Sequence, residues 1–347
     1  MKLFLALALG ISVGTFAHAE NIKVATSFSI IEDMVKNVGG DKVEVINLVG
    51  TDADMHQYEM RPEDIKRFAS HGDIKAFFVN GLELDSWANN LAMAADFSGK
   101  LVAVSDGIKA RKLQEEIIGE ESKKEEHEHE HDDDHQHAKE HATHDHKYHD
   151  HEHEGHEHGH EGHEHGHEGH HHHGNIDPHA WQSLENAVVY VDNIEKTLSE
   201  VDKANATFYA ENAKAYKAKL TTLNEELKKA FAALPANHRY LVTSHEALGY
   251  FADAYGLTVL TPLGVASESE PSAKDIANVI KEIRAKNIPA VFLENVKNPK
   301  LLEQISRETG AKIGGTLYTD ALAKSGEGST YFGMMQSNAQ KILEGLK

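Results

Sequence analysis

Residues 203–234 read KANATFYAENAKAYKAKLTTLNEELKKAFAAL and contain neither glycine nor proline. In the second half of this stretch, apolar side chains recur at steps of three and four residues, the period of one helix face: Tyr216, Leu220, Leu223, Leu227, Phe231 and Leu234. A continuous helix over the whole stretch would be roughly 48 Å long at ~1.5 Å per residue. This length exceeds one small domain, so the stretch predicts a rigid helix that connects two of them.

The residues before this helix alternate between strand and helix patterns. Strands are predicted at 22–28, 43–49, 75–79 and 101–104, and helices at 29–38, 62–70, 85–95 and 184–198. Gly39-Gly40 ends the first helix, and Pro62 begins the second. Such alternation is typical of a parallel sheet with helices on both faces.

The residues after the long helix repeat this alternation. Strands are predicted at 240–243, 258–260, 290–293 and 313–318, and helices after Ser272 and at 299–309 and 331–346. We therefore predict an α/β fold with two Rossmann-like lobes, each with a central parallel sheet, joined by one long rigid helix. The predicted boundaries are 20–202 for the N-terminal lobe, 203–234 for the helix and 235–347 for the C-terminal lobe.

The N-terminus has the pattern of an export signal. Lys2 is followed by a short apolar run at 3–13 and by Ala17-His18-Ala19, an A-x-A cleavage pattern. The run is shorter than the roughly 20 residues that a membrane-spanning helix needs. We expect residues 1–19 to be a cleaved signal peptide, and the mature chain to be periplasmic without membrane insertion.

Cysteine is absent from the sequence. The protein therefore has no disulfide and no cysteine at the cleavage point to carry a lipid anchor, so we expect a freely diffusing monomer. Any metal site must be built from His, Asp or Glu. The formal net charge of −21 argues against nucleic acid or an anionic membrane as a partner.

A histidine-rich tract is the most unusual part of the sequence. Residues 127–173 hold 21 of the 27 histidines together with 14 Asp or Glu, and their formal charge is −12 with neutral histidine. Almost no apolar residue is present, so the tract cannot bury enough surface to offset the entropy of ordering it. We predict that residues 121–174 form a disordered loop in the N-terminal lobe.

Three candidate metal ligands follow predicted strands. His56 comes after the strand at 43–49, His245 after the strand at 240–243 and Asp320 after the strand at 313–318. In open parallel sheets, ligands bind outside the carboxyl ends of the strands. These three side chains can therefore face one cleft between the lobes.

A fourth candidate, His179, lies in Asp177-Pro178-His179-Ala180-Trp181, where Asp177 can orient the imidazole ring. Three imidazoles and one carboxylate suit tetrahedral Zn²⁺. Glu59 or a water molecule remains an alternative to Asp320 as the fourth ligand. His71 and His238 lie beside predicted helix-end and loop residues, and we interpret both as surface histidines.

An enzymatic function is disfavoured. His245-Glu246-Ala247-Leu248-Gly249 begins like the zinc-peptidase pattern H-E-x-x-H but has glycine in place of the second histidine. A hydrolytic zinc site also keeps an open coordination position, which four protein ligands would close. We expect no catalysis and no cofactor other than Zn²⁺, bound as the transported ion.

The chain resembles the metal-specific solute-binding proteins of ABC importers, especially their zinc-uptake members. The resemblance covers residues 21–347 apart from the tract, and the following motifs carry it: His56 with Tyr58-Glu59 and Pro62, Asn80-Gly81-Leu82-Glu83, Asp177-Pro178-His179-Ala180-Trp181, Val242-Thr243-Ser244-His245, Glu268-Ser269-Glu270-Pro271-Ser272 and Tyr318-Thr319-Asp320. It implies two α/β lobes with the metal between them.

The resemblance also places His56, His179, His245 and Asp320 at the ligand positions of that family. Manganese-type members tend to carry glutamate where this chain has His245, so the resemblance implies zinc. The partners that it implies are a membrane permease and its ATPase. Two other hypotheses stay open, namely an exported zinc buffer or storage protein that acts through the tract, and a metallohydrolase.

If the tract is a weak collector of metal, its capacity depends on pH. Imidazole coordinates metal only when neutral, and an unperturbed histidine titrates near pKa 6.5. Protonating the 21 histidines would change the formal charge of residues 127–173 from −12 to +9. Calorimetric zinc titrations at about pH 7.5 and about pH 5.5, with and without the tract, should show several weak sites that need both the tract and the higher pH. Weak sites that keep full capacity at the lower pH would contradict this.

Overall fold

The computed structural model describes residues 21–113, 176–262 and 271–347. The predicted signal peptide at 1–19 and the predicted disordered loop at 121–174 lie outside the described residues, and so do Glu268, Ser269 and Glu270. Within the three described ranges, no helix combines the length and the apolarity that crossing a bilayer requires.

The first sheet has four parallel strands in the order β2-β1-β3-β4. They are β1 (Ile22–Phe28), β2 (Val43–Val49), β3 (Ile74–Val79) and β4 (Lys100–Ala103). The central strand β1 buries Val24, Ala25 and Phe28 completely or nearly so. Thr26 and Ser27 between them are also buried, as expected for a parallel strand that is covered on both faces. The observed bounds of this strand are those predicted from the sequence.

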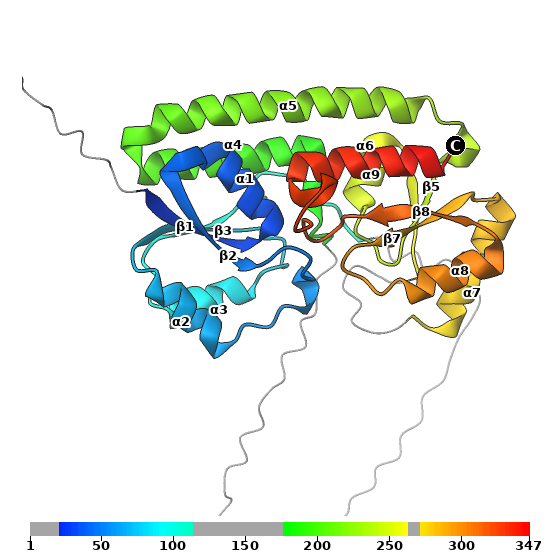
Figure 1. The fold of residues 1–347 in the computed structure, drawn as a ribbon, viewed down its shortest axis with the longest axis horizontal. Helices are drawn as coiled ribbons and strands as arrows, with labels where there is room; N and C mark the ends of the chain where they lie inside the picture. The colour runs from blue at the N-terminus through cyan, green and yellow to red at the C-terminus, as the bar shows by residue number, and fades with distance from the viewer. Residues whose placement is uncertain (1–20, 114–175, 263–270) are drawn as a thin grey trace, which may run out of the picture. The chain divides into compact units, whose positions relative to one another are not determined.

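Four helices cover this sheet. They are α1 (Ser29–Gly39), α2 (Pro62–Ser70), α3 (Trp87–Ala94) and α4 (Leu184–Val201). Figure 1 shows α1 and α4 on one side of the sheet and α2 and α3 on the other. The predicted parallel α/β arrangement of the N-terminal lobe is thus confirmed.

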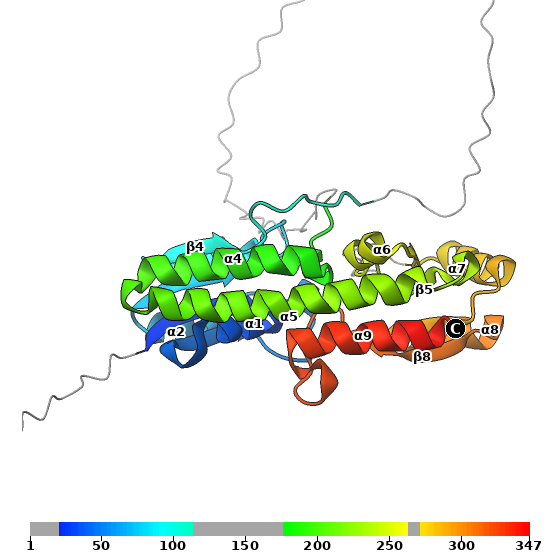
Figure 2. The ribbon, with the colours of Figure 1, turned by 90° about the horizontal axis from the view of Figure 1, so that it is seen from above.

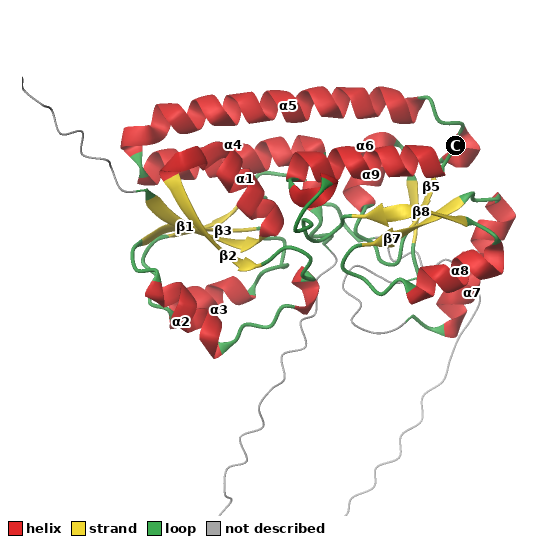
Figure 3. Cartoon of the chain, in the orientation of Figure 1, coloured by secondary structure: helices red, strands yellow, loops and turns green. Residues whose placement is uncertain are grey.

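The C-terminal lobe contains two parallel strand pairs, β5 with β6 and β7 with β8. The strands are β5 (Tyr240–Val242), β6 (Thr258–Leu260), β7 (Ala290–Glu294) and β8 (Lys312–Leu317). The helices are α6 (Gly249–Tyr255), α7 (Ala273–Lys286), α8 (Lys300–Thr309) and α9 (Tyr331–Gly345), and Figure 3 shows them around the strands. The helix predicted after Ser272 is α7, and Ser272 and Asp275 form a capping box at its start. Helix α6 was not predicted, because it is short and begins at a glycine.

Helix α5 (Ala206–Ala232) joins the lobes. Residues Lys203–Asn205 form a separate 3₁₀ turn, so the α-helix is shorter than predicted, roughly 40 Å at ~1.5 Å per residue. Along its length α5 contacts α1 and α4 of the first lobe and α6 and α9 of the second (Figures 1 and 2). The predicted apolar stripe is the buried face of this helix. The long connecting helix is confirmed, whereas the residue boundaries of the lobes stay a prediction.

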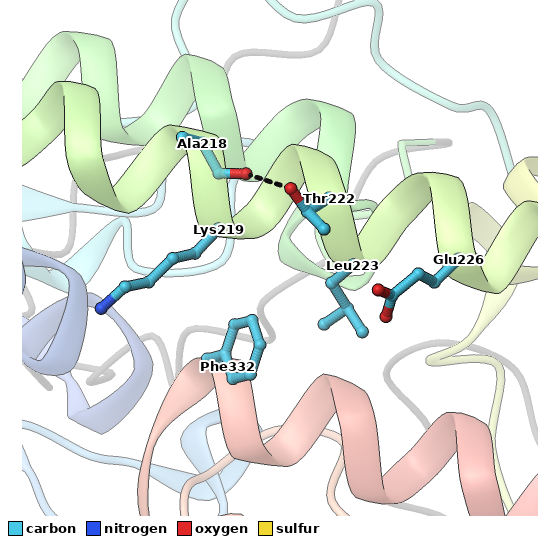
Figure 4. Close-up of a pocket in the computed structure, with 6 residues that line it drawn as sticks. All are labelled: Ala218, Lys219, Thr222, Leu223, Glu226 and Phe332. Atoms are coloured by element: carbon cyan, nitrogen blue, oxygen red, sulfur yellow. Dashed lines mark hydrogen bonds between the residues drawn. The ribbon is translucent and has the colours of Figure 1, made fainter.

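A shallow groove of about 330 Å³ runs between α5 and α9 (Figure 4). Its lining residues are Ala218, Lys219, Thr222, Leu223, Glu226 and Phe332. The Thr222 hydroxyl donates a hydrogen bond to the carbonyl of Ala218 on its own helix at 3.0 Å, so it is not directed at a ligand. None of the lining residues is a candidate metal ligand. We interpret the groove as a surface depression between two packed helices.

Aromatic packing fastens the end of α5 to the C-terminal lobe. Phe231 is fully buried, stacks on Tyr255 with ring centroids 5.2 Å apart, and meets Phe251 edge-on at 5.5 Å. The Tyr255 hydroxyl also donates to Asn224 Oδ1 of α5 at 3.0 Å. These contacts make Phe231 the aromatic anchor of α5 on α6.

Replacing Phe231 with Ala should lower the free energy of unfolding by about 3–5 kcal/mol, the usual cost of truncating a buried phenylalanine. Urea unfolding of the metal-free protein, followed by circular dichroism, measures this. Phe208→Ala is the matched control, because Phe208 lies on the same helix but is only half-buried. Equal losses in the two variants would show that the aromatic cluster has no special role.

Candidate metal centre

The four candidate ligands lie at the ends of secondary-structure elements. His56 lies in the 3₁₀ turn Met55–Gln57 after β2, and His179 directly precedes the 3₁₀ turn Ala180–Gln182 that leads into α4. His245 follows β5, and Asp320 follows β8. For His56, His245 and Asp320, this is the placement that the sequence predicted, outside the carboxyl ends of parallel strands.

The structure brings these four side chains together, with one ligand atom from each within 4.8 Å of all the others. Nε2 of His56 lies 2.9 Å from Nε2 of His179. Oδ1 of Asp320 lies 3.3 Å from Nε2 of His179 and 3.8 Å from Nε2 of His56, and Oδ2 lies 3.1 Å from Nε2 of His245. In a tetrahedral site with metal–nitrogen bonds of 2.0–2.1 Å, neighbouring donors lie roughly 3.3–3.4 Å apart. The four separations of 2.9–3.8 Å lie on either side of that value, so the arrangement can hold one ion after small side-chain movements.

The cluster is withdrawn from solvent. His179 and Asp320 are 0% exposed, His245 is 2% exposed, and the side chain of His56 is 4% exposed. A buried charge is costly unless opposite charge or hydrogen bonds compensate it. In the described part of the chain, no other group of three or more His, Asp or Glu side chains lies close enough to hold a metal ion.

A buried carboxylate orients each of two imidazoles. Asp177 Oδ1 lies 2.8 Å from Nδ1 of His179 and also accepts the His179 backbone N–H at 3.0 Å. Glu294 Oε2 lies 2.6 Å from Nδ1 of His245, and Oε1 accepts the backbone N–H groups of Ser244 and His245. Such contacts leave Nε2 of each ring free to point at a metal ion. The role of Asp177 was predicted, whereas Glu294 was missed.

Electrostatics favour positive charge at the centre. Burial raises the pKa of Asp320, but the neighbouring imidazoles, His245 first, lower it well below the usual range. Burial lowers the pKa of His245, but the carboxylates of Glu294 and Asp320 raise it to about 10. Asp177 and Asp320 likewise raise the pKa of His179 against burial, whereas burial leaves the pKa of His56 lowered. A divalent ion can supply this charge when it displaces protons from the imidazoles.

Hydrogen bonds between the lobes hold the turn beside His179 against the residue before Asp320. The indole Nε1 of Trp181 and the amide Nε2 of Gln182 both donate to the carbonyl of Thr319, at 2.9 and 2.7 Å. The Tyr331 hydroxyl donates to the carbonyl of Trp181 at 2.6 Å. The distance between the imidazole of His179 and the carboxylate of Asp320 is thus set by buried contacts.

A second residue that sequence reasoning missed is Arg111. Its guanidinium reaches Asp177 Oδ2 at 3.2 Å, Glu246 Oε1 at 2.9 Å and Asp253 Oδ2 at 3.2 Å. Glu246 of the H-E-x-x-H-like segment therefore pairs with an arginine. A Cβ at Gly249 would lie 2.4 Å from Nη1 of Arg111, which explains the glycine where a zinc peptidase would carry its second histidine.

The structure does not bring the other candidate residues to the cluster. His71 and His238 are half-buried and stand outside it, and Glu59 is exposed. Asp320 is therefore the carboxylate that the geometry favours as the fourth ligand. That these four residues bind the ion stays a prediction, developed below.

Comparison with known proteins places the chain and its fold in a family. The family model described as "Zinc-uptake complex component A periplasmic" matches residues 24–345. The manganese ABC transporter substrate-binding lipoprotein PsaA of Streptococcus pneumoniae is 30% identical, with 100% of this chain and 97% of that protein covered. The metal ABC transporter substrate-binding lipoprotein ScbA of Streptococcus cristatus is 32% identical, with 96% and 91% covered.

Solved structures of periplasmic metal-binding proteins share the fold. The periplasmic zinc binding protein TroA from Treponema pallidum matches with a TM-score of 0.72 and 25% identity, over 94% of this chain and 99% of that one. Manganese-bound and cadmium-bound structures of a periplasmic metal binding protein from candidatus liberibacter asiaticus each match with a TM-score of 0.69 and 25% identity, over 94% of this chain and 100% of theirs. The resemblance inferred from the sequence motifs is confirmed. The chain belongs to the family of the periplasmic component A of zinc-uptake complexes, and it is a metal-binding, substrate-binding protein of an ABC importer.

Proposed function

We propose that this protein captures Zn²⁺ in the periplasm, holds it with His56, His179, His245 and Asp320, and delivers it to the permease of an ABC importer. The observation that carries the proposal is the convergence of three imidazole Nε2 atoms and one carboxylate at a buried point. The ligands come from both lobes, so the ion itself would join the lobes. Such an arrangement suits capture and release of an ion better than catalysis, since no coordination position is left open.

The donor set supports zinc as the ion. Imidazole nitrogen is a common zinc ligand, and a set of three imidazoles with one carboxylate fits tetrahedral coordination. Manganese and other hard cations favour carboxylate, carbonyl and water oxygens in octahedral sites. His245 contributes a nitrogen at a position where the resemblance described above implies glutamate in manganese-type members. A relative named for manganese is 30% identical to this chain. The proposal of zinc therefore rests on the candidate ligand side chains and not on the names of relatives.

The mature protein would act as a free periplasmic monomer after removal of residues 1–19. The curated relatives named above are lipoproteins, whereas this chain contains no cysteine that could carry a lipid. The partners would be the metal ion, the permease and the ATPase that drives it. The histidine-rich tract would supply weak binding beside the tight site, and the alternative of a buffer or storage protein would make that tract the main functional part.

Replacing His56, His179 or His245 with Ala should each weaken zinc binding by orders of magnitude, because each removal opens a buried site and leaves the remaining charges less compensated. Asp320→Ala should matter less if a water molecule takes the vacated position. Competition with a chromophoric zinc chelator measures the affinity, and His71→Ala is the matched control because His71 lies outside the cluster. The proposal fails if two of the three cluster variants bind zinc as tightly as the parent.

His245→Glu should move the metal preference toward manganese. The substitution exchanges a nitrogen for carboxylate oxygens, which are harder donors. It also places a third carboxylate beside those of Glu294 and Asp320, which already contact the His245 ring. We expect the ratio of zinc affinity to manganese affinity, measured by isothermal calorimetry, to fall by at least about tenfold. An unchanged ratio would show that His245 does not determine selectivity, and His238→Glu controls for the added charge.

A further inference from the structure

The loop that carries His56 is held against the C-terminal lobe. Asp52, His56 and their neighbours lie between β2 and α2 of the first lobe. The backbone N–H of Asp52 donates to the carbonyl of Leu322 at 2.9 Å, and Asp52 Oδ2 accepts the N–H of Lys324 at 3.0 Å. His56 thus reaches the cluster on a loop that must stay docked on the other lobe.

His56 is the least buried of the four candidate ligands. Its side chain is 4% exposed, whereas His179 and Asp320 are 0% exposed. It lies in a 3₁₀ turn of a loop, where local opening costs less than in a helix or strand. The contacts that hold this loop on the C-terminal lobe should therefore influence the dissociation rate of a bound ion.

An ion pair joins this loop to the other lobe two residues before His56. Lys297 follows β7, and its Nζ lies 2.7 Å from Oδ2 of Asp54. The Lys297 side chain is 18% exposed and the Asp54 side chain 8%. The other oxygen of the same carboxylate, Oδ1, accepts the backbone N–H of His56 at 3.0 Å. One carboxylate thus contacts both the backbone of the candidate ligand and a cation of the opposite lobe.

We propose that Asp54 and Lys297 form an inter-lobe latch that keeps His56 on the ion and so slows metal release. Exposed ion pairs contribute little, but removing one partner of a pair withdrawn from solvent leaves a charge uncompensated and mainly raises the dissociation rate. Asp54 and Lys297 are positioning residues, since neither belongs to the ligand cluster. The inference rests on the proposed function, because it assigns the regulation of release to the same site.

A simpler role for the pair is an electrostatic field on the ion, and the two roles predict opposite effects of Lys297→Met on the release rate. Asp54→Asn leaves the Lys297 cation unpaired, and Lys297→Met leaves the Asp54 carboxylate unpaired. A field alone would make the first variant release a cation faster and the second release it more slowly, and the double variant would resemble the parent. A latch makes both single variants faster, and the double variant as fast as either one.

The experiment uses the full chain loaded with one equivalent of zinc, and it follows release into excess chelator by stopped flow. We expect Asp54→Asn and Lys297→Met each to release zinc about tenfold faster or more, with an unchanged association rate. The double variant should be no faster than the single variants, because both remove one interaction. Asn can still accept the His56 N–H, so the turn is retained. Lys228→Met is the matched control, since Lys228 lies 2.7 Å from Glu185 in a more exposed pair outside the cluster.

Opposite effects of the two single variants, or release rates equal to that of the parent, would overturn the latch. Circular dichroism of the metal-free variants checks that they fold, and Lys297→Arg should restore slow release if the cation is what the loop needs. A parent protein without a slowly released ion would contradict the proposed function itself, and this inference with it.

Discussion

The carboxylate of Asp320 is fully buried at the point where the two lobes meet, and the surrounding imidazoles compensate its negative charge. An ionised carboxylate in that position is costly unless positive charge or strong hydrogen bonds surround it. Two of its imidazole neighbours come from the first lobe and one from the second. The buried carboxylate therefore favours a bound cation. It can contact imidazoles of both lobes only if the lobes keep a fixed position relative to each other.

The rest of the fold provides that fixed relation. Helix α5 packs on both lobes, and the 3₁₀ turn beside His179 is hydrogen-bonded to the carbonyl of Thr319, the residue next to Asp320. Asp177 and Glu294 then fix the rotation of two imidazole rings. A rigid frame lowers the cost of assembling the four candidate ligands, and our proposal makes His56, on its loop, the part that opens. Under this proposal, tight capture and release can coexist in one site.

Much of this architecture could be predicted from the sequence. The strand at 22–28 follows from its apolar residues and the stripe on α5 from its helical period, and the four candidate ligands follow from their places after strands and before a helix. Glu294 was missed because the predicted strand stopped at Leu293, one residue short. Arg111 and the Asp54–Lys297 pair have no local signal, since their partners lie 66 to 243 residues away along the chain. Such contacts depend on tertiary structure, which apolar periodicity does not encode.

The central claim is that one zinc ion binds to His56, His179, His245 and Asp320. A crystal structure of the zinc-loaded protein, with anomalous differences recorded on both sides of the zinc absorption edge, tests it most directly. We expect one strong anomalous peak about 2.0–2.1 Å from three Nε2 atoms and at a similar distance from an oxygen of Asp320. A strong peak elsewhere, with none between these four side chains, would contradict the account.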